Sequence, residues 1–153
     1  MEDNLYTCIC LLDIEKCFDT INHVILLEKM KCYGIQNKEI EWFSNYLQNR
    51  RQIVNFKNKL SKPELMKIGI PQGSVLGPLL FLLFINDIGQ STYPCSCNMF
   101  ADDVVIYCDA ANVTQLESNM NKSLKNVNEW YKNNHLNVNA SKCNRMVTET
   151  ALS

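Results

Sequence analysis

Two adjacent carboxylates, Asp102 and Asp103, stand between two short apolar segments, and this pattern constrains the fold of the chain more than any other. The segments run from Cys95 to Met99 and from Val104 to Tyr107. Strand-forming residues on both sides of a short polar turn indicate a β-hairpin with the two carboxylates at its tip. Taken alone, such a pair is more often a solvated turn than a catalytic site, so its meaning depends on the partners that the chain supplies.

The size and composition of the chain are those of one globular domain with a substantial core. It has 153 residues, of which 46% are hydrophobic and 20% charged. A net charge of -1 argues against a generally basic surface, so a nucleic-acid partner needs a local patch or segments outside this chain. The longest apolar block, Leu79 to Ile85, is far shorter than the roughly 20 residues that span a bilayer. We therefore expect a single domain over residues 1–153 and no membrane partner.

The eight cysteines indicate reduced thiols packed as small hydrophobic side chains in an intracellular protein. None forms a Cys-x-x-Cys motif, and both histidines, His23 and His135, are far from the close cysteine pairs in sequence. A zinc-binding module is therefore a weaker alternative. The compartment stays open between nucleus and cytoplasm, since no basic nuclear signal is visible.

Hydrophobic periodicity predicts an alternation of strands and helices along the chain. Asn112 and Gln115 are spaced as a capping box ahead of the longest helix. The predicted elements, in order, are a strand over Leu5 to Leu12, helices over Ile25 to Tyr33 and Asn37 to Asn49, strands over Ile53 to Phe56 and Glu64 to Ile68, a helix over Leu79 to Ile85, the hairpin, a helix over Val113 to Tyr131, and a strand ending near Val147. This order predicts an α+β fold in which helices back an antiparallel sheet.

Asp13 follows the first predicted strand directly, so its carboxylate lies at the exit of that strand. If that strand neighbours one strand of the hairpin, Asp13 converges with Asp102 and Asp103. Several converging carboxylates are what two-metal phosphoryl or nucleotidyl transfer needs, with ions about 3.5 to 4 Å apart. Magnesium prefers such hard oxygen ligands. The sequence alone does not establish that the strands are neighbours.

Two other features have both a structural and a functional interpretation. Arg50 and Arg51 are either charges that protect an edge strand or contacts to nucleic-acid phosphates. The segment Gly69 to Pro78 has three glycines and two prolines in ten residues. It is either a loop whose backbone amides approach a docked ligand or a plain lead-in to the next helix.

Four blocks of the sequence resemble, in order and in spacing, palm motifs A, B, C and D of the reverse transcriptases of non-LTR (LINE-type) retrotransposons. The blocks are Asp13 to Asp19, Gly69 to Phe81, Phe100 to Asp103, and Leu136 to Lys142. Together they cover nearly the whole chain. The resemblance implies a polymerase palm whose antiparallel sheet carries a catalytic Asp-Asp hairpin packed against helices.

The resemblance also implies the metal site. Asp13 matches the motif A aspartate that binds both metals, with the carbonyl of Ile14 as a further ligand. Asp102 and Asp103 match the motif C pair, and Asp102 is the firmer ligand of the two. The implied cofactor is a pair of Mg²⁺ ions, for which Mn²⁺ can substitute. Lys142 matches the motif D lysine, a candidate general acid for the pyrophosphate leaving group, and a solvated surface charge is the equal alternative.

Other positions match the nucleotide pocket of the family. Phe18 matches the aromatic residue that crowds the sugar 2' position, and a place in the core is the alternative interpretation of its ring. Gln72 matches the glutamine near the incoming nucleotide and template, and Gly73 and Ser74 let the backbone approach the base pair. For Asp19, a structural role is favoured over a metal ligand, as a cap at the start of the following helix.

Two departures are small and one is large. Cys17 stands where the family commonly has alanine, and Cys143 where it has threonine; both are small, so we expect the pocket to survive. The family's fingers and thumb have no counterpart in this sequence, so we expect a fragment of a longer protein.

The implied activity is RNA-directed DNA polymerisation, with an RNA template, a DNA primer and dNTPs as partners. The alternative is an inactive or domesticated retrotransposon relic that acts only as a folded interaction module.

Overall fold

The computed structural model describes residues 4–151, which divide into two compact units. The first unit combines the described residues up to Cys17 with those from Ile85 onward, and the second runs from Phe18 to Phe84. The division into two units does not test the expectation of one domain over residues 1–153, which stays a prediction.

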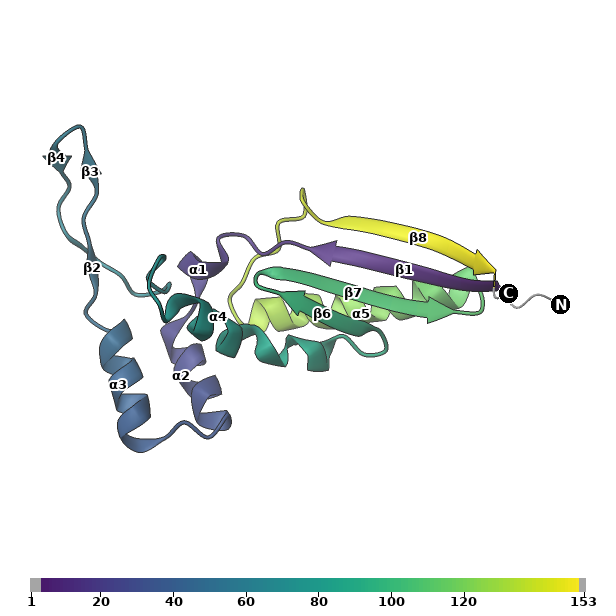
Figure 1. The fold of residues 1–153 in the computed structure, drawn as a ribbon, viewed down its shortest axis with the longest axis horizontal. Coiled ribbons are helices and arrows are strands. Elements are labelled where there is room, and N and C mark those ends of the chain that lie inside the picture. The colour runs from purple at the N-terminus through teal and green to yellow at the C-terminus, as the bar shows by residue number, and fades with distance from the viewer. Residues whose placement is uncertain (1–3, 152–153) are drawn as a thin grey trace. The chain divides into compact units, whose positions relative to one another are not determined.

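A four-stranded antiparallel sheet forms the first unit, with strands in the order β6–β7–β1–β8 (Figure 1). The strands are β1 (Asn4–Leu12), β6 (Ser96–Phe100), β7 (Asp103–Ala110) and β8 (Asn144–Ala151). The first strand of the chain is thus central and pairs with two strands from the far end of the sequence. The predicted combination of helices with an antiparallel sheet is confirmed.

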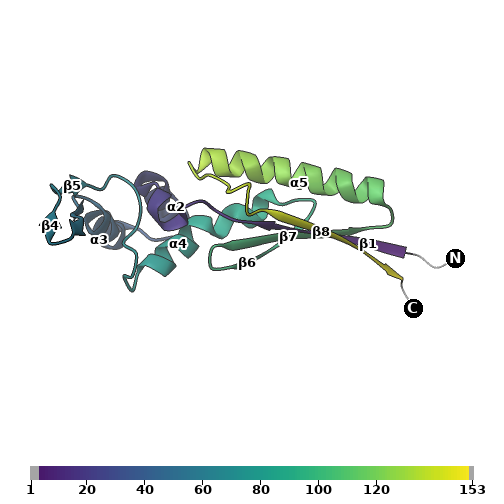
Figure 2. The ribbon, with the colours of Figure 1, turned by 90° about the horizontal axis from the view of Figure 1, so that it is seen from above.

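One face of this sheet is covered by α5 (Val113–Asn133), which lies along the strands (Figure 2). Side chains alternate across a strand, so every second residue of β1 and β7 points toward the helix. The buried residues of β1 and β7 on this face are Cys8, Cys10, Leu12, Val104, Ile106, Cys108 and Ala110, and those of α5 are Leu116, Met120, Ser123, Val127, Trp130 and Tyr131. The predicted cap is present, since the Asn112 side chain accepts a hydrogen bond from the Gln115 amide at 2.8 Å.

Two short elements belong wholly or in part to the first unit. The 3₁₀-helix η1 (Asn86–Ser91) packs against α5 and β6. A single helical turn, α1 (Cys17–Thr20), begins at the last residue of the N-terminal stretch of the first unit and continues into the second unit. Five of the eight cysteines are buried, which confirms that they pack as small hydrophobic residues.

The second unit is built on α2 (His23–Cys32), α3 (Asn37–Leu47) and the apolar helix α4, whose bounds are Gly77–Ile85. Its fully buried side chains include Leu26, Met30, Leu47, Leu80 and Phe84. All three helices were predicted within a few residues. Within residues 4–151, no helix combines the length and the apolar character that crossing a bilayer requires.

The second unit also contains a two-stranded ribbon, which is made of two short pairs of strands. β2 (Arg51–Gln52) pairs with β5 (Glu64–Leu65), and β3 (Asn55–Phe56) pairs with β4 (Lys59–Leu60). The predicted strands were too long: Ile53 and Val54 lie outside the ladder, and the strand that was expected to reach Ile68 ends at Leu65. The apolar residues here are largely exposed, so no core face holds the strands in register.

Candidate active site

The register of β1 on β7 brings Asp13 and Asp103 to one end of the sheet. The last ladder pair is Leu12 opposite Val104, and the next residues along the two strands are Asp13 and Asp103. Since Leu12 and Val104 are buried on the face toward α5, the following pair belongs to the opposite face. The Asp13 side chain is 31% exposed. β1 and β7 are therefore the neighbours that convergence of the carboxylates requires.

Asp102 lies in the turn of the β6–β7 hairpin. Phe100 pairs with Asp103, which leaves Ala101, with a φ of 53°, and Asp102 as the connecting residues. The thiol of Cys17 donates to Oδ2 of Asp102 at a distance of 3.7 Å. Cys17 is only 5% exposed, so this carboxylate contacts a buried side chain on the exit segment of β1.

The segment before β8 holds Lys142 beside Asp13. The backbone amide of Asn139 donates to the Asp13 carbonyl at 2.9 Å, and that of Glu15 donates to the Asn137 carbonyl at 2.9 Å. The Lys142 amide in turn donates to the Asn139 carbonyl at 3.0 Å. Nζ of Lys142 lies 3.8 Å from Oδ2 of Asp13. The exposed Lys142 and the half-buried Asp13, far apart in sequence, are thus brought together by backbone hydrogen bonds.

A metal ion bound at this end of the sheet would need some of its ligands to come from water and substrate. Across residues 4–151, no three His, Cys, Asp or Glu side chains form a group that could hold an ion by themselves. Magnesium commonly takes one or two protein carboxylates and completes its shell with waters and substrate phosphates. The hard oxygen donors of Asp13 and Asp103 fit that mode. Ile14 is held nearby by an antiparallel bridge to Val138.

In the second unit, Phe18 stacks on Phe81. Their ring centroids are 5.1 Å apart and the ring planes differ by 27°. Phe81 is 1% exposed, whereas Phe18 is half-buried. The Phe18 ring is therefore fixed from the core side and keeps part of its surface accessible, which is compatible with both interpretations of this residue.

Gln72 is tied to Asp19, whose role differs from the one expected. Asn22 caps α2 by accepting hydrogen bonds from Val24 and Ile25, so the prediction that Asp19 caps this helix was wrong. The Asp19 carboxylate instead accepts a hydrogen bond from Nε2 of Gln72 at 2.8 Å. A bond across 53 residues leaves no local signal, so sequence reasoning missed it.

Backbone geometry shapes the loop around Gln72. Gly69 has a φ of 81°, and a Cβ there would lie 2.7 Å from the Asp19 carbonyl oxygen, so only glycine fits. Gly73 has a φ of 76° with open space where a Cβ would be, so its backbone is accessible. Ser74 is used inside the loop: Oγ donates to the Pro71 carbonyl at 2.7 Å and accepts from the Gly77 amide at 3.0 Å.

A pocket of about 400 Å³ brings Arg50, Arg51 and Gln72 together. Nη2 of Arg50 donates to the Gly69 carbonyl at 3.1 Å, which anchors the guanidinium at the pocket. Nε of Arg50 is buried without a hydrogen-bond partner in the described part of the chain. Guanidinium groups bind phosphate and carboxylate groups in fork geometry. The pocket therefore suits an anionic group.

The sequence of this chain is similar to those of known proteins. The family model described as "Reverse transcriptase (RNA-dependent DNA polymerase)" matches residues 1–152. Among curated relatives, a probable RNA-directed DNA polymerase from transposon X-element of Drosophila melanogaster is 32% identical, over 88% of this chain and 15% of that protein. One from transposon BS of the same fly is 28% identical, over 92% of this chain and 16% of that protein. The chain thus spans about a sixth of these relatives.

Solved structures share the fold. The apo telomerase of Candida tropicalis, truncated from its C-terminal domain, superposes with a TM-score of 0.70 at 18% identity, over 97% of this chain and 32% of that one. A Candida albicans telomerase, in complex with a fragment of telomeric RNA, has a TM-score of 0.69 at 12% identity, over 92% of this chain and 28% of that one.

Proposed function

Because the chain belongs to the reverse transcriptase family of RNA-dependent DNA polymerases, we propose that it is the palm of such an enzyme, with a catalytic hairpin at Asp102 and Asp103. In this proposal a primer 3'-hydroxyl attacks the α-phosphate of a dNTP, and pyrophosphate leaves. The observation that carries the proposal is the register of β1 on β7, in which Asp13 follows one strand and Asp103 begins its neighbour.

The metal-binding residues of the proposal are Asp13, Asp102 and Asp103, with the carbonyl of Ile14. Two Mg²⁺ ions, or Mn²⁺ in their place, would supply activation of the attacking hydroxyl and stabilisation of the leaving group. The protein's contribution is to hold its carboxylates in place. The strand register positions Asp13 and Asp103, and the Cys17 thiol contacts Asp102.

Lys142 is the proposed general acid, which gives a proton to the departing pyrophosphate. Its side chain is 68% exposed, and its ammonium nitrogen lies 3.8 Å from the Asp13 carboxylate. Backbone hydrogen bonds through Asn139 restrict how far Lys142 can move from Asp13. A positioned donor of this kind typically contributes about 10²-fold or more to rate.

The nucleotide-binding residues of the proposal are Phe18, Gln72 and Gly73. Phe18 excludes a ribose 2'-hydroxyl, and Phe81 keeps its ring from turning away. Gln72 carries an amide oriented by Asp19, and Gly73 offers open backbone where a base pair approaches.

Nucleic acid is held by Arg50, Arg51 and Ser74 in this proposal, with an RNA template and a DNA primer as partners. The arginines share the pocket with Gln72 and would meet backbone phosphates. Ser74 would contribute its backbone, since its hydroxyl is used within the loop. Recognition of the hybrid relies on shape and backbone. Fingers and thumb would have to come from segments beyond residues 1–153.

Metal binding tests the proposal directly. We expect Mn²⁺, followed by electron paramagnetic resonance, to bind the wild-type chain, and Asp13→Asn and Asp102→Asn to weaken binding. Asp109→Asn is the matched control, because it removes a carboxylate from the opposite end of β7. Magnesium-dependent dNTP incorporation on a primed RNA should be lost in Asp102→Asn. Equal Mn²⁺ affinity in all four proteins would contradict the proposed site, and the inactive interaction module would then be the better description.

A further inference from the structure

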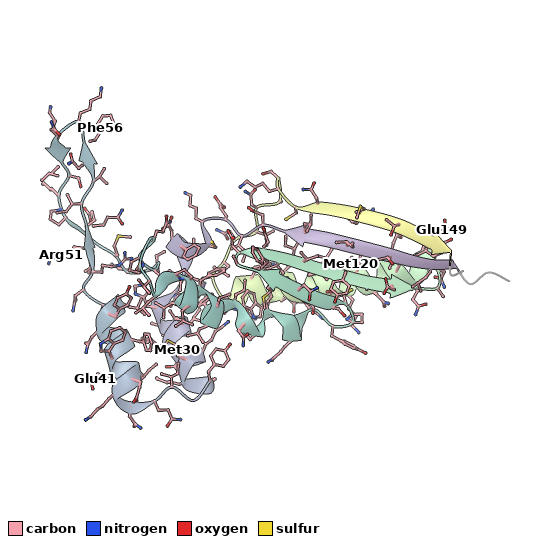
Figure 3. All side chains as sticks on the ribbon, viewed as in Figure 1. Met30, Glu41, Arg51, Phe56, Met120 and Glu149 are labelled. Atoms are coloured by element: carbon pink, nitrogen blue, oxygen red, sulfur yellow. The ribbon has the colours of Figure 1, made fainter. Side chains whose placement is uncertain are left out.

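The ribbon formed by residues 51–65, here called the basic hairpin, exposes apolar side chains that no core covers. Phe56 is 68% exposed and Leu60 70% exposed. Figure 3 shows Phe56 at the tip of this hairpin and Arg51 near its base. A two-stranded ribbon cannot bury such residues against itself, and isolated ribbons of this kind are marginally stable in water. These side chains are therefore available to a partner.

The charge of the basic hairpin is opposite in sign to that of the chain as a whole. It contains four basic residues and one acidic residue, a net charge of +3, whereas the whole chain carries -1. The basic residues are Arg51, Lys57, Lys59 and Lys62, and all four are exposed. Positive charge concentrated in this way complements a polyanion.

Lysines flank the exposed aromatic ring. Nζ of Lys57 lies 5.4 Å from the centroid of the Phe56 ring. Lys59 is the cross-strand partner of Phe56, so the two side chains lie on the same face of the ribbon. An aromatic face with cations beside it matches the chemistry of a base and its adjoining phosphates.

The turn that presents Phe56 is defined by backbone geometry. Lys57 and Asn58 have φ values of 49° and 61°, the positive pair that a type I′ hairpin turn requires. A lysine in this conformation is uncommon. Below the turn, Oγ of Ser61 accepts a hydrogen bond from the Val54 amide at 3.0 Å. The tip is thus held in a specific shape although it buries nothing.

We propose that the basic hairpin binds single-stranded nucleic acid, with Phe56 stacked on an unpaired base and Lys57 and Lys59 on the flanking phosphates. A single strand is the occupant because its base faces are open to stacking, whereas a duplex covers them. The inference extends the proposed function and does not depend on catalysis.

Fluorescence anisotropy of the full chain with a short labelled RNA, single-stranded or annealed to its complement, tests the inference. The wild type should bind the single strand more tightly than the duplex. Phe56→Ala should weaken single-strand binding by roughly tenfold. Phe56→Leu should weaken it as much, because leucine keeps the apolar area and loses the ring, whereas Phe56→Trp should retain it. These positions are exposed, so the fold should tolerate the changes.

The salt dependence separates the lysines from the ring. The double variant Lys57→Ala/Lys59→Ala should reduce the slope of log K against log salt by about 0.7 per lysine. Lys125→Ala/Lys132→Ala on α5 removes the same charge elsewhere and should leave binding unchanged. Asp102→Asn should bind RNA as the wild type does, so failure of the hairpin and failure of the catalytic site are distinguishable.

Three results would overturn the inference. Equal binding of duplex and single strand would show that no base is stacked. Full affinity in Phe56→Leu would show that the aromatic ring does not stack on a base. Equal loss in the α5 lysine pair would show that binding follows overall charge.

Discussion

The thiol of Cys17 lies 3.7 Å from a carboxylate oxygen of Asp102, so the side chain at position 17 decides how much room this carboxylate has. Cys17 itself is buried. A larger residue has to displace its neighbours, and an added methylene in a packed site typically costs about 1 to 3 kcal/mol.

We therefore expect Cys17→Leu to lower the free energy of unfolding by about 1 to 3 kcal/mol and to weaken Mn²⁺ binding. Cys17→Ala should retain Mn²⁺ binding, because a small side chain leaves the carboxylate where it is. Urea denaturation and Mn²⁺ titration measure the two effects. Cys32→Leu, at an exposed cysteine, is the control. Normal metal affinity in Cys17→Leu would show that Asp102 is not constrained from this side.

Lys142→Ala should reduce kcat for dNTP incorporation by about 10²-fold while KM changes little, since a general acid acts in the transition state. The free energy of unfolding should change by less than about 0.5 kcal/mol, because a solvent-accessible ion pair such as that between Lys142 and Asp13 contributes little to stability. Single-turnover primer extension gives the rates. Lys132→Ala, an exposed lysine on α5, should keep the wild-type rate. Loss of substrate affinity with an unchanged kcat would contradict the acid role.

Phe18→Ala should raise the use of ribonucleotides relative to deoxynucleotides, because the proposed role of its ring is to crowd the sugar 2' position. It should also destabilise the chain by about 1 kcal/mol through loss of the stack on Phe81. Phe18→Tyr keeps the ring and should keep the discrimination. Competitive incorporation of rNTP and dNTP measures the ratio. Unchanged sugar discrimination in Phe18→Ala would assign this residue to the core alone.

The bond between Gln72 and Asp19 predicts energetic coupling. A double-mutant cycle of Asp19→Ala and Gln72→Ala, measured by urea denaturation, should give an interaction energy of about 0.5 kcal/mol or more. Without such coupling, Asp19→Ala would cost the same with or without Gln72. Additive effects in the cycle would therefore show that this hydrogen bond contributes nothing measurable to stability.

The buried thiols predict a loss of stability at high pH. Burial, followed by the neighbouring Cys95 thiol, raises the pKa of Cys108 from 9.0 to about 12. Burial also raises the pKa of Cys8 and of Cys10. These groups bind protons more tightly in the folded state, so their contribution is complete below pH 9.0 and is lost as pH rises toward about 12.

The urea midpoint should accordingly fall as pH is raised through this window. Cys108→Ala should show a shallower decline than the wild type, because one of the contributing thiols is gone. Cys32→Ala, which removes an exposed thiol, should follow the wild-type curve. A midpoint that does not change with pH would show that the thiols ionise equally in both states.

Local patterns predicted most elements of the fold. The apolar block from Leu79 to Ile85 predicted α4, and apolar residues at three- and four-residue spacing predicted α5. Asn112 caps α5, as its spacing from Gln115 predicts. Strand extent in the ribbon was overestimated because Ile53 and Val54 have strand-forming side chains but no surface to pack against.

Strand order and long-range side-chain contacts were beyond local patterns. The pairing of β1 with β7 and β8 joins residues as far apart in sequence as Cys8 and Cys108, or Cys8 and Val147, and no local pattern in these segments specifies the partner. For the same reason, the contacts of Cys17 with Asp102 and of Asn139 with Asp13 had no signal except small or polar residues near a turn.

The central position of β1 makes the length of this strand critical for the candidate site. β1 pairs in register with both β7 and β8. Deleting one residue within β1 therefore changes the position of Asp13 relative to both neighbouring strands. Residues on one side of the deletion also change face, so the alternation that buries Cys8, Cys10 and Leu12 is broken. A one-residue deletion in this strand should therefore disrupt the candidate site more than most single substitutions in the chain.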